Sequence, residues 1–385
     1  MNLASYLADN SDFDVYYVNN YFQQDSKHYF SSKLKNYTPD SFDYSLSSDV
    51  VFFTPVNYLM HLLVRIKDYP YARICLYQYS VQAVNWLRHN MSYTCSSEEI
   101  EGFLNGYSAR AYMNSACLGQ NALNAELDDK VYLPIVMSET YQSDYSVESV
   151  IDNDRINIGY LGALNSESIC LLYNLFSNLS AANNDKKTDI HVIGRAKLSL
   201  NSGFKKSSSN LARVIFTGDI DAESRKNYIR KNIDILIASK NNAIEGAACG
   251  VPVVVPVCDN KPFVGNNYVY LFDIKGYRYS FDYSGLLESG SRSCKFDKIL
   301  NDVYIRHEKC ELARACYDYC LENNSLKVVA ERFINLISNS DLYVKDCLCE
   351  RGFTNSIKLY EDYAKANDCN GYGQYLKEKS VTPKK

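Results

Sequence analysis

The chain has 385 residues, which is long enough for two domains of ordinary size. Its 46% hydrophobic and 22% charged residues are typical of a globular protein, so we expect no large disordered region. A net charge of -4 and a pI of about 5.8 argue against a nucleic-acid partner, because binding a phosphate backbone requires a basic surface.

The first part of the chain alternates between strand and helix patterns. Short β-branched and aromatic runs predict strands at 14–19, 50–55, 72–79, 109–115 and 131–137. Apolar residues at helical spacing predict helices at 1–8, 58–67, 81–88 and 118–127. Ser96 and Glu99 form a capping-box pattern that predicts one more helix, through Leu104. This alternation predicts a parallel, doubly wound sheet.

Residues 138–154 are rich in Ser, Asp, Glu and Tyr and predict an interdomain linker beside a cleft. A second alternating series follows it. Its predicted strands are 156–161, 189–193, 214–217, 233–238, 251–257 and 268–272. Its predicted helices are 168–179, 222–230, 297–305, 311–321 and 325–337, with a last helix at 357–366 before a Lys-rich tail at 377–385.

The stretch 233–257 predicts a complete βαβ unit. Two short apolar runs flank a small-residue helix that carries one acid, Glu245, and ends at Gly250 before Pro252. Ligands of parallel sheets bind outside the carboxyl ends of the strands. The polar turn and the start of the helix, residues 239–245, are therefore expected at the mouth of a site.

The segment EGAACGVPVVV, residues 245–255, resembles a motif of GT-B glycosyltransferases, in particular glycosyltransferase family 4. The resemblance implies an α/β fold of two Rossmann-like, doubly wound parallel-sheet domains. It assigns 1–137 to an acceptor-side domain that lacks its usual first strand and Gly-rich loop, and 155–337 to the nucleotide-sugar donor domain. Residues 338–385 would cross back to the first domain, and Glu245 would hold the ribose hydroxyls of the donor.

The predicted strand ends add further donor-binding candidates. A glycine follows each of three strands, and a turn with one cation opens the helix of Glu245. The candidates are Gly162, Gly194, Arg195, Gly218, Lys240, Asn241, Asn242 and Glu245. Each candidate also has an explanation that involves no ligand. The glycines are common in turns, and Arg195 and Lys240 are ordinary surface charges. Glu245 could complement the helix dipole.

Two departures from family 4 bear on the chemistry. The family has Gly-Arg-Leu and then a Lys after the first strand of the donor domain, where this chain has Gly162-Ala163-Leu164 and Ser168. We therefore expect Lys240 and Arg195 to replace the missing cations at the diphosphate. The family commonly has a His after the fourth strand of the first domain, and this chain has Gln78 and Tyr79 in that region instead. We therefore assign no catalytic residue.

Metal and disulfide chemistry are not expected. The 13 cysteines and 5 histidines have no zinc-binding spacing, and we expect reduced thiols packed as small apolar residues. Asp219 and Asp221 form an isolated D-x-D on a fold of the wrong class for a metal-bridged donor. No apolar run approaches the roughly 20 residues of a membrane helix, and the first residues do not have the pattern of a secretion signal.

The sequence therefore predicts a cytoplasmic, metal-independent glycosyltransferase. It would move a sugar from a UDP- or GDP-sugar to a glycan, lipid-linked or other acceptor, in polysaccharide or glycoconjugate synthesis, in the cytoplasm or at the inner face of the membrane. No separate cofactor is expected. A non-catalytic GT-B member that binds a sugar nucleotide or partners another transferase is the alternative, and an epimerase of the same fold is a third. No G-x-G-x-x-G follows a strand, which disfavours a dinucleotide oxidoreductase.

Overall fold

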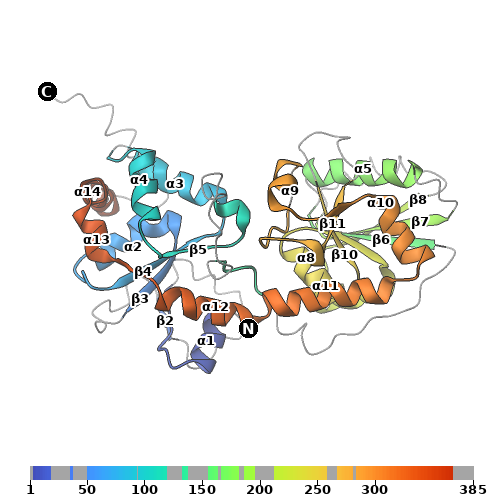
Figure 1. Cartoon of the computed structure of the whole chain (residues 1–385), viewed down its shortest axis with the longest axis horizontal. Helices are drawn as coiled ribbons and strands as arrows, with labels where there is room; N and C mark the ends of the chain where they lie inside the picture. The colour runs from blue at the N-terminus through green and yellow to red at the C-terminus, as the bar shows by residue number, and fades with distance from the viewer. Residues whose placement is uncertain are drawn as a thin grey trace. The chain divides into compact units, whose positions relative to one another are not determined.

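The computed structural model describes most of the chain (Figure 1). The described residues are 3–18, 35–37, 50–92, 94–118, 132–137, 155–163, 166–181, 186–195, 212–257, 267–280 and 283–366. Contacts divide the chain into two compact units: unit 1 is Met1–Pro134 with Val329–Lys385, and unit 2 is Ile135–Val328. The predicted linker 138–154 and the predicted helix 118–127, apart from Leu118, lie outside the described residues.

The described residues of unit 2 form one sheet in the order β12-β11-β10-β9-β6-β7-β8. Neighbours from β10 to β8 are parallel, whereas β11 and β12 add antiparallel edge strands. The strands are β6 (Arg155–Leu161), β7 (Lys187–Ile193), β8 (Ala212–Gly218), β9 (Ile235–Ala238), β10 (Val253–Pro256), β11 (Tyr268–Tyr270) and β12 (Ser293–Cys294). Strand order therefore reverses between β6 and β9, where β7 and β8 extend one way and β10 the other.

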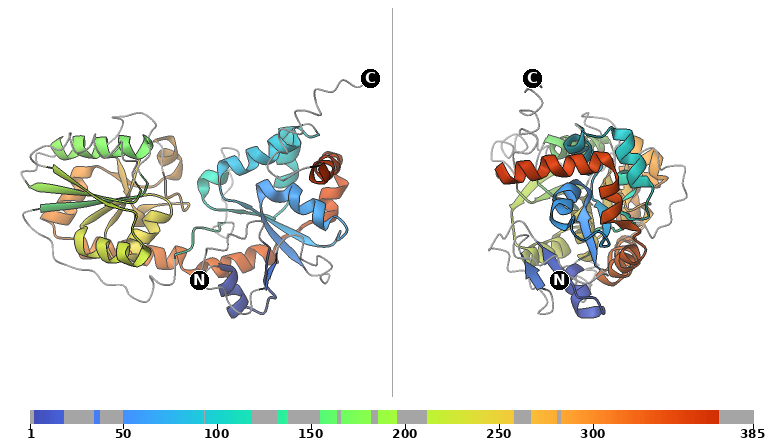
Figure 2. Two further views of the ribbon diagram at one scale, coloured as in Figure 1. Left: turned by 180° about the vertical axis from the view of Figure 1, so that it is seen from behind. Right: turned by 90° about the vertical axis from the view of Figure 1, so that its left-hand side faces the viewer.

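Helices cover both faces of this sheet, with α5 over one face and α8 over the other (Figures 1 and 2). The helices are α5 (Ser166–Ala181), α7 (Ala222–Asn232), α8 (Asn241–Ala248), α9 (Tyr283–Ser289), α10 (Phe296–Leu300) and α11 (Lys309–Asn324), with a π-helix at Asn301–Ile305 and a 3₁₀ turn at Leu271–Asp273. The main core packs alternate strand residues, such as Ile158 and Ile190, against Leu175 of α5 and Ile299 of α10.

Small residues let α8 pack close to the sheet. Ala243, Ala247 and Ala248 are fully buried. A Cβ atom on Gly246 would lie 2.2 Å from Cδ2 of Leu236 in β9. The small-residue pattern around Glu245 is thus also a packing requirement, since larger side chains would push this helix off its strand.

Unit 1 is built around the strand β4. The described strands are β1 (Tyr16–Val18), β2 (Lys35–Tyr37), β3 (Val51–Pro55), β4 (Arg73–Gln78), β5 (Arg110–Tyr112) and β13 (Leu342–Tyr343). β3 pairs with β4 in parallel along one edge, and the other edge is shared by β5, in parallel, and β13, antiparallel. β1 and β2 form a separate parallel pair.

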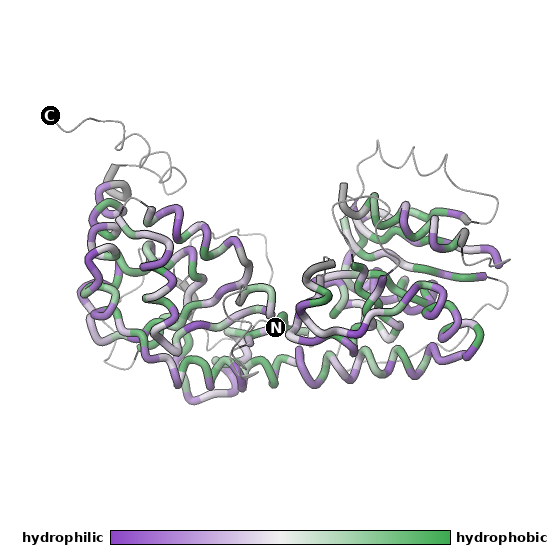
Figure 3. The backbone as a smooth tube through the Cα atoms, turned by 45° about the horizontal axis from the view of Figure 1, so that its top comes forward, coloured by the Kyte–Doolittle hydropathy of each residue, from purple (hydrophilic) through white to green (hydrophobic). Residues whose placement is uncertain are grey.

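Segments from both ends of the chain build the core of unit 1. Its helices are α1 (Leu3–Asn10), α2 (Leu59–Ile66), α3 (Val81–Met91), α4 (Ser97–Asn105), α13 (Val344–Cys349) and α14 (Arg351–Ala366), with 3₁₀ turns at Val56–Tyr58 and Ser115–Leu118. Phe353 and Ile357 of α14 pack into one cluster with Leu63 of α2. α12 (Leu326–Ser338) carries the chain from unit 2 into unit 1, where its Phe333 makes an edge contact with Phe53 of β3. Figure 3 shows hydrophilic and hydrophobic residues alternating along such helices, as expected for one buried face.

The predicted α/β class and the two mainly parallel sheets are confirmed. The predicted capping box is confirmed as well, because Glu99 N donates to Ser96 Oγ and Ser96 N to Glu99 Oε2. The predicted strand 131–137 is wrong over its described part, residues 132–137. Only Tyr132 forms a bridge, with Tyr112, and residues 133–137 belong to no strand. Pro134 in this run has no N–H for a ladder hydrogen bond.

Candidate functional site

Three glycines end neighbouring strands of unit 2, and we call Gly162, Gly194 and Gly218 the glycine edge. They follow or close β6, β7 and β8 at the carboxyl end of the sheet. Gly162 N donates to Ile193 O at 3.0 Å, and Gly194 N donates to Gly218 O at 3.0 Å. These hydrogen bonds thus tie the strand ends together beyond the regular ladder, at three positions that have no side chain of their own.

The close approach at Gly194 requires glycine. Its φ is +135°, and a Cβ atom there would lie 2.5 Å from the carbonyl oxygen of Gly162. Gly218 also has a positive φ, +74°, but no atom lies within 4 Å of its hypothetical Cβ. Gly194 therefore needs glycine for both space and conformation, whereas Gly218 needs it for conformation alone.

The start of α8 lies at the same end of the sheet. Lys240 is its N-cap, with φ 55° and ψ -136°, and has no side-chain capping bond. Nδ2 of Asn242 donates to the carbonyl of Leu161 at 3.1 Å, which ties the first turn of α8 to the end of β6. Lys240 and Asn241 are exposed. The backbone N–H groups at the start of a helix generally favour an anion, and here the exposed side chain of Lys240 lies at that start.

Glu245 does not stand alone on α8. Its Oε1 accepts a hydrogen bond from Nε of Arg225 on α7 at 2.5 Å, and Nη1 of Arg225 donates to Ile220 O at 3.3 Å. The side chains are only 24% exposed for Arg225 and 16% for Glu245, so solvent screens this pair weakly. The sequence did not point to Arg225, because its helix also carries Arg230 and Lys231. Only the folded structure shows which of these cations pairs with Glu245.

Arg195 lies at the end of β7, as expected, but it is engaged. Its Nε donates to Oδ2 of Asp219 at 2.6 Å, and this hydrogen bond raises the pKa of Arg195. Asp221 instead caps α7 through Ser224 N at 2.9 Å, which lowers the pKa of Asp221. The two acids of the D-x-D thus serve different partners. Among the described residues no group of three or more His, Cys, Asp or Glu is arranged to hold a metal ion.

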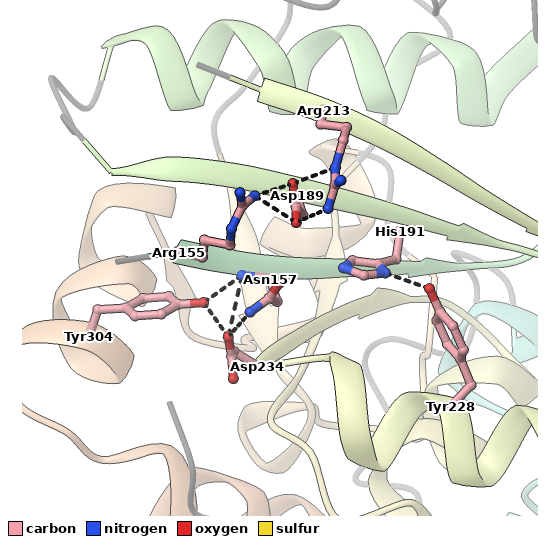
Figure 4. Close-up of polar contacts among 8 residues, drawn as sticks. All are labelled: Arg155, Asn157, Asp189, His191, Arg213, Tyr228, Asp234 and Tyr304. Carbon is pink, nitrogen blue, oxygen red and sulfur yellow. Dashed lines mark hydrogen bonds and ion pairs between the residues drawn. The ribbon is translucent and has the colours of Figure 1, made fainter. Parts of the chain in front are cut away.

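A second polar cluster lies toward the amino ends of the same strands (Figure 4). Asp189, with a side chain 5% exposed, accepts from Arg155 and Arg213 at distances between 2.6 and 3.1 Å. Asp234, buried just before β9, accepts from Tyr304 at 2.9 Å and from Lys309 at 2.8 Å. These charges satisfy one another, which is the arrangement of a structural network rather than of a ligand site.

Comparison with known proteins gives distant matches. No protein-family model matches the chain, and a search of the curated proteins finds no match. Among solved structures it is similar to TarM, with 12% identity and a TM-score of 0.45 over 74% of this chain and 54% of that one. The chain therefore spans about half the length of TarM.

Two further solved structures cover more of their own length. WaaG, a glycosyltransferase involved in lipopolysaccharide biosynthesis, has 12% identity and a TM-score of 0.44 over 87% of this chain and 94% of that one. HepE from Anabaena, in complex with UDP and glucose, has 11% identity and a TM-score of 0.40 over 75% and 77%. The assignment of a function therefore rests on the residues of the site itself.

No helix in the described part of the chain has the length and apolar character needed to cross a membrane.

Proposed function

We propose that the chain is a glycosyltransferase that moves a sugar from a UDP- or GDP-sugar to a glycan or lipid-linked acceptor. The observation that carries the proposal is Glu245, a carboxylate at the carboxyl end of a parallel sheet, held by Arg225 on the same unit as the glycine edge. Its segment, 245–255, resembles the donor-binding motif of GT-B transferases. A carboxylate in that place accepts hydrogen bonds from two neighbouring ribose hydroxyls.

The reaction places demands on the start of α8. The bond between the sugar's anomeric carbon and a diphosphate oxygen breaks, and a bond to an acceptor oxygen forms as the acceptor hydroxyl loses its proton. Negative charge then grows on the departing diphosphate. A helix start contributes only about 0.3 to 2 kcal/mol to an anion, so a cation is needed too.

Lys240 is our candidate for that cation, because it is exposed at the head of α8. Arg195 remains the second candidate, although it has to exchange Asp219 for the diphosphate before it can act. The glycine edge would let the diphosphate and sugar approach the backbone closely. Gly162, Gly194 and Gly218 are proposed to serve in this way, with Asn241 and Asn242 at the helix start.

The proposed substrate class also bears on the cofactor, the acceptor and the location of the protein. The nucleotide sugar is a substrate, so neither a metal nor a separate cofactor is assigned. The acceptor would be a growing glycan or a lipid-linked sugar in polysaccharide or glycoconjugate synthesis. Such acceptors are met in the cytoplasm or at the inner face of the membrane, where the chain would act peripherally.

Replacement of Glu245 tests the proposal. Two charge-assisted hydrogen bonds to ribose make Glu245→Ala cost about 2 to 4 kcal/mol of nucleotide affinity, roughly 30- to 700-fold in Kd. Calorimetry with UDP and GDP measures the affinity, and thermal unfolding measures the stability. Glu308→Ala is a matched control, because Glu308 is also paired with an arginine of unit 2, Arg306, at 2.7 Å.

The outcomes separate the possible roles. Loss of affinity at Glu245 with none at Glu308 supports the ribose contact. Equal losses of stability in both variants, with nucleotide affinity unchanged, leave Glu245 a structural role. Wild-type binding of UDP or GDP without sugar transfer from any donor tried indicates the non-catalytic alternative.

A further inference from the structure

A chain of hydrogen bonds runs from the start of α8 to the end of α11. Lys240 N donates to Tyr279 O at 2.8 Å, and the hydroxyl of Tyr279 donates to Oδ1 of Asn324 at 2.9 Å. Nδ2 of Asn324 donates to Ile135 O at 2.7 Å, and Met137 N donates to Asn324 O at 2.7 Å. We call Lys240, Tyr279 and Asn324, with these bonds, the α8 anchor.

Two of the three residues of the anchor are buried, whereas Lys240 at its near end is exposed. Tyr279 is 2% exposed and Asn324 is 0% exposed. A buried polar group that loses its partner carries the full desolvation penalty, so the buried bond between Tyr279 and Asn324 resists opening. Asn324 bonds to Ile135 and Met137, where the chain enters unit 2. It lies four residues before Val328, the last residue of that unit. The anchor is therefore fixed at its far end by two hydrogen bonds to one segment, residues 135–137.

The near end of the anchor is conformationally strained. Lys240 has φ 55° and Tyr277 has φ 56°, and Gly276 beside it has φ 62°. Residues other than glycine rarely adopt such angles, which persist only where the surroundings over-determine them. The carbonyl of Tyr279 supplies one such constraint, because it accepts the N–H of the strained Lys240.

We propose that Tyr279 and Asn324 are positioning residues for the ligand-binding start of α8. The phenol of Tyr279 is fixed by Asn324 and the carbonyl of the same residue fixes Lys240, so the side chain determines where the turn lies. This inference rests on the proposed function, since it gives the turn at Lys240 the task of receiving the diphosphate. Neither residue touches the ligand; both act through the backbone of Lys240.

Tyr279→Phe removes the hydroxyl and keeps the ring and the carbonyl. We expect about five- to tenfold weaker binding of UDP or GDP in calorimetry, the effect of losing one ordered hydrogen bond. The amide of Lys240 should exchange with solvent faster by a similar factor. Tyr304→Phe is the matched control, because Tyr304 is 4% exposed and its hydroxyl donates to Asp234 at the other end of the sheet. It should lose stability without either change.

Lys240→Gly supplies a test that a merely structural role would not pass. Glycine adopts a positive φ without strain, so the turn no longer depends on the anchor. Because Lys240→Gly also removes the proposed cation, Lys240→Ala is the reference, since it lacks the cation and keeps the strain at φ 55°. Tyr279→Phe should change nucleotide affinity less than twofold in the Lys240→Gly background, a strongly non-additive double-mutant cycle, and about five- to tenfold in the Lys240→Ala background. Full additivity, or unchanged exchange at Lys240 in Tyr279→Phe, overturns the inference.

The two proposals fail in different ways. Wild-type protein that binds neither UDP nor GDP contradicts the proposed function, and amide exchange at Lys240 then still decides whether Tyr279 holds the turn. Wild-type binding with Tyr279→Phe indistinguishable from Tyr304→Phe contradicts the positioning role alone. If Tyr279→Phe does not fold, Asn324→Ser removes the far partner of the phenol and takes its place in the same cycle.

Discussion

Substitution of Gly194 by alanine tests the packing of the glycine edge. Two costs add at this position. A positive φ costs an alanine about 1 to 2 kcal/mol, and the added methyl group meets the carbonyl oxygen of Gly162 at 2.5 Å. Overpacking of this kind costs about 1 to 3 kcal/mol, because backbone rather than a flexible side chain must shift. We expect Gly194→Ala to lower the free energy of unfolding by about 2 to 5 kcal/mol.

Other glycines separate the two costs. Gly218 and Gly290 have φ of +74° and +63° with no atom within 4 Å of a hypothetical Cβ, so their alanine variants should lose only the conformational 1 to 2 kcal/mol or so. Gly102 lies exposed inside α4 with open space around it, and Gly102→Ala should stabilise the chain by about 0.5 to 1 kcal/mol.

Guanidinium unfolding followed by circular dichroism measures this series. The order expected is a large loss at Gly194, smaller and similar losses at Gly218 and Gly290, and a gain at Gly102. A Gly194→Ala variant no less stable than Gly218→Ala would refute the close approach of the β6 and β7 ends. The glycine edge would then have no special reason to be free of side chains.

Two buried polar groups give further predictions. His191 bonds Tyr228 through Nδ1 at 2.7 Å while its Nε2 is buried without a hydrogen-bond partner, and burial lowers its pKa below the ordinary 6.5. Its stabilising contribution is thus complete above about pH 6.5 and is lost as pH falls through the folded-state pKa, by up to about 1.4 kcal/mol per pH unit. Melting temperatures between pH 7.5 and 5.5 should fall less steeply in His191→Gln than in wild type; equal slopes would show that other groups cause the fall. Lys309→Met should cost about 3 to 5 kcal/mol in chemical unfolding, because it leaves Asp234 a buried, uncompensated charge. Adding Asp234→Asn should recover part of that loss, and strictly additive losses would contradict the coupling.

The parallel part of unit 2 is predictable from sequence for a clear reason. Strands buried on both faces read as continuous apolar runs, and the run of β9 is such a case. The helix between β9 and β10 is recognisable because its small residues end at Gly250, whose φ is +80°. A short strand gives no such signal: β2 has three residues and β13 has two, and β13 pairs with Ile74, far away in sequence. Only the tertiary structure defines strands of this kind.

The positions of the predicted site residues follow from the same logic, whereas their partners do not. The glycines and the start of α8 end up at one end of the sheet because each follows a parallel strand. The pairing of Glu245 with Arg225, of Arg195 with Asp219 and of Lys240 with Tyr279 depends on loops and helices whose mutual placement has no local pattern. Periodicity therefore places a residue on an element, and packing decides what it touches.

The two ends of the unit 2 sheet differ in how their charged groups are placed. At the amino ends, the buried charge of Asp189 is neutralised by two arginines and that of Asp234 by Lys309, so removing Lys309 leaves Asp234 without a compensating charge. At the carboxyl ends, glycine backbones and a helix start replace side chains, and the charged groups there lie nearer the surface. A diphosphate could replace the existing partners of the charged groups at the carboxyl ends, but not those of the buried charges at the amino ends. Substitutions of charged side chains should therefore act mainly on stability at the amino ends and mainly on ligand binding at the carboxyl ends. Arg225 combines both requirements, because it holds Glu245 in a largely buried pair that the proposed nucleotide would have to leave intact.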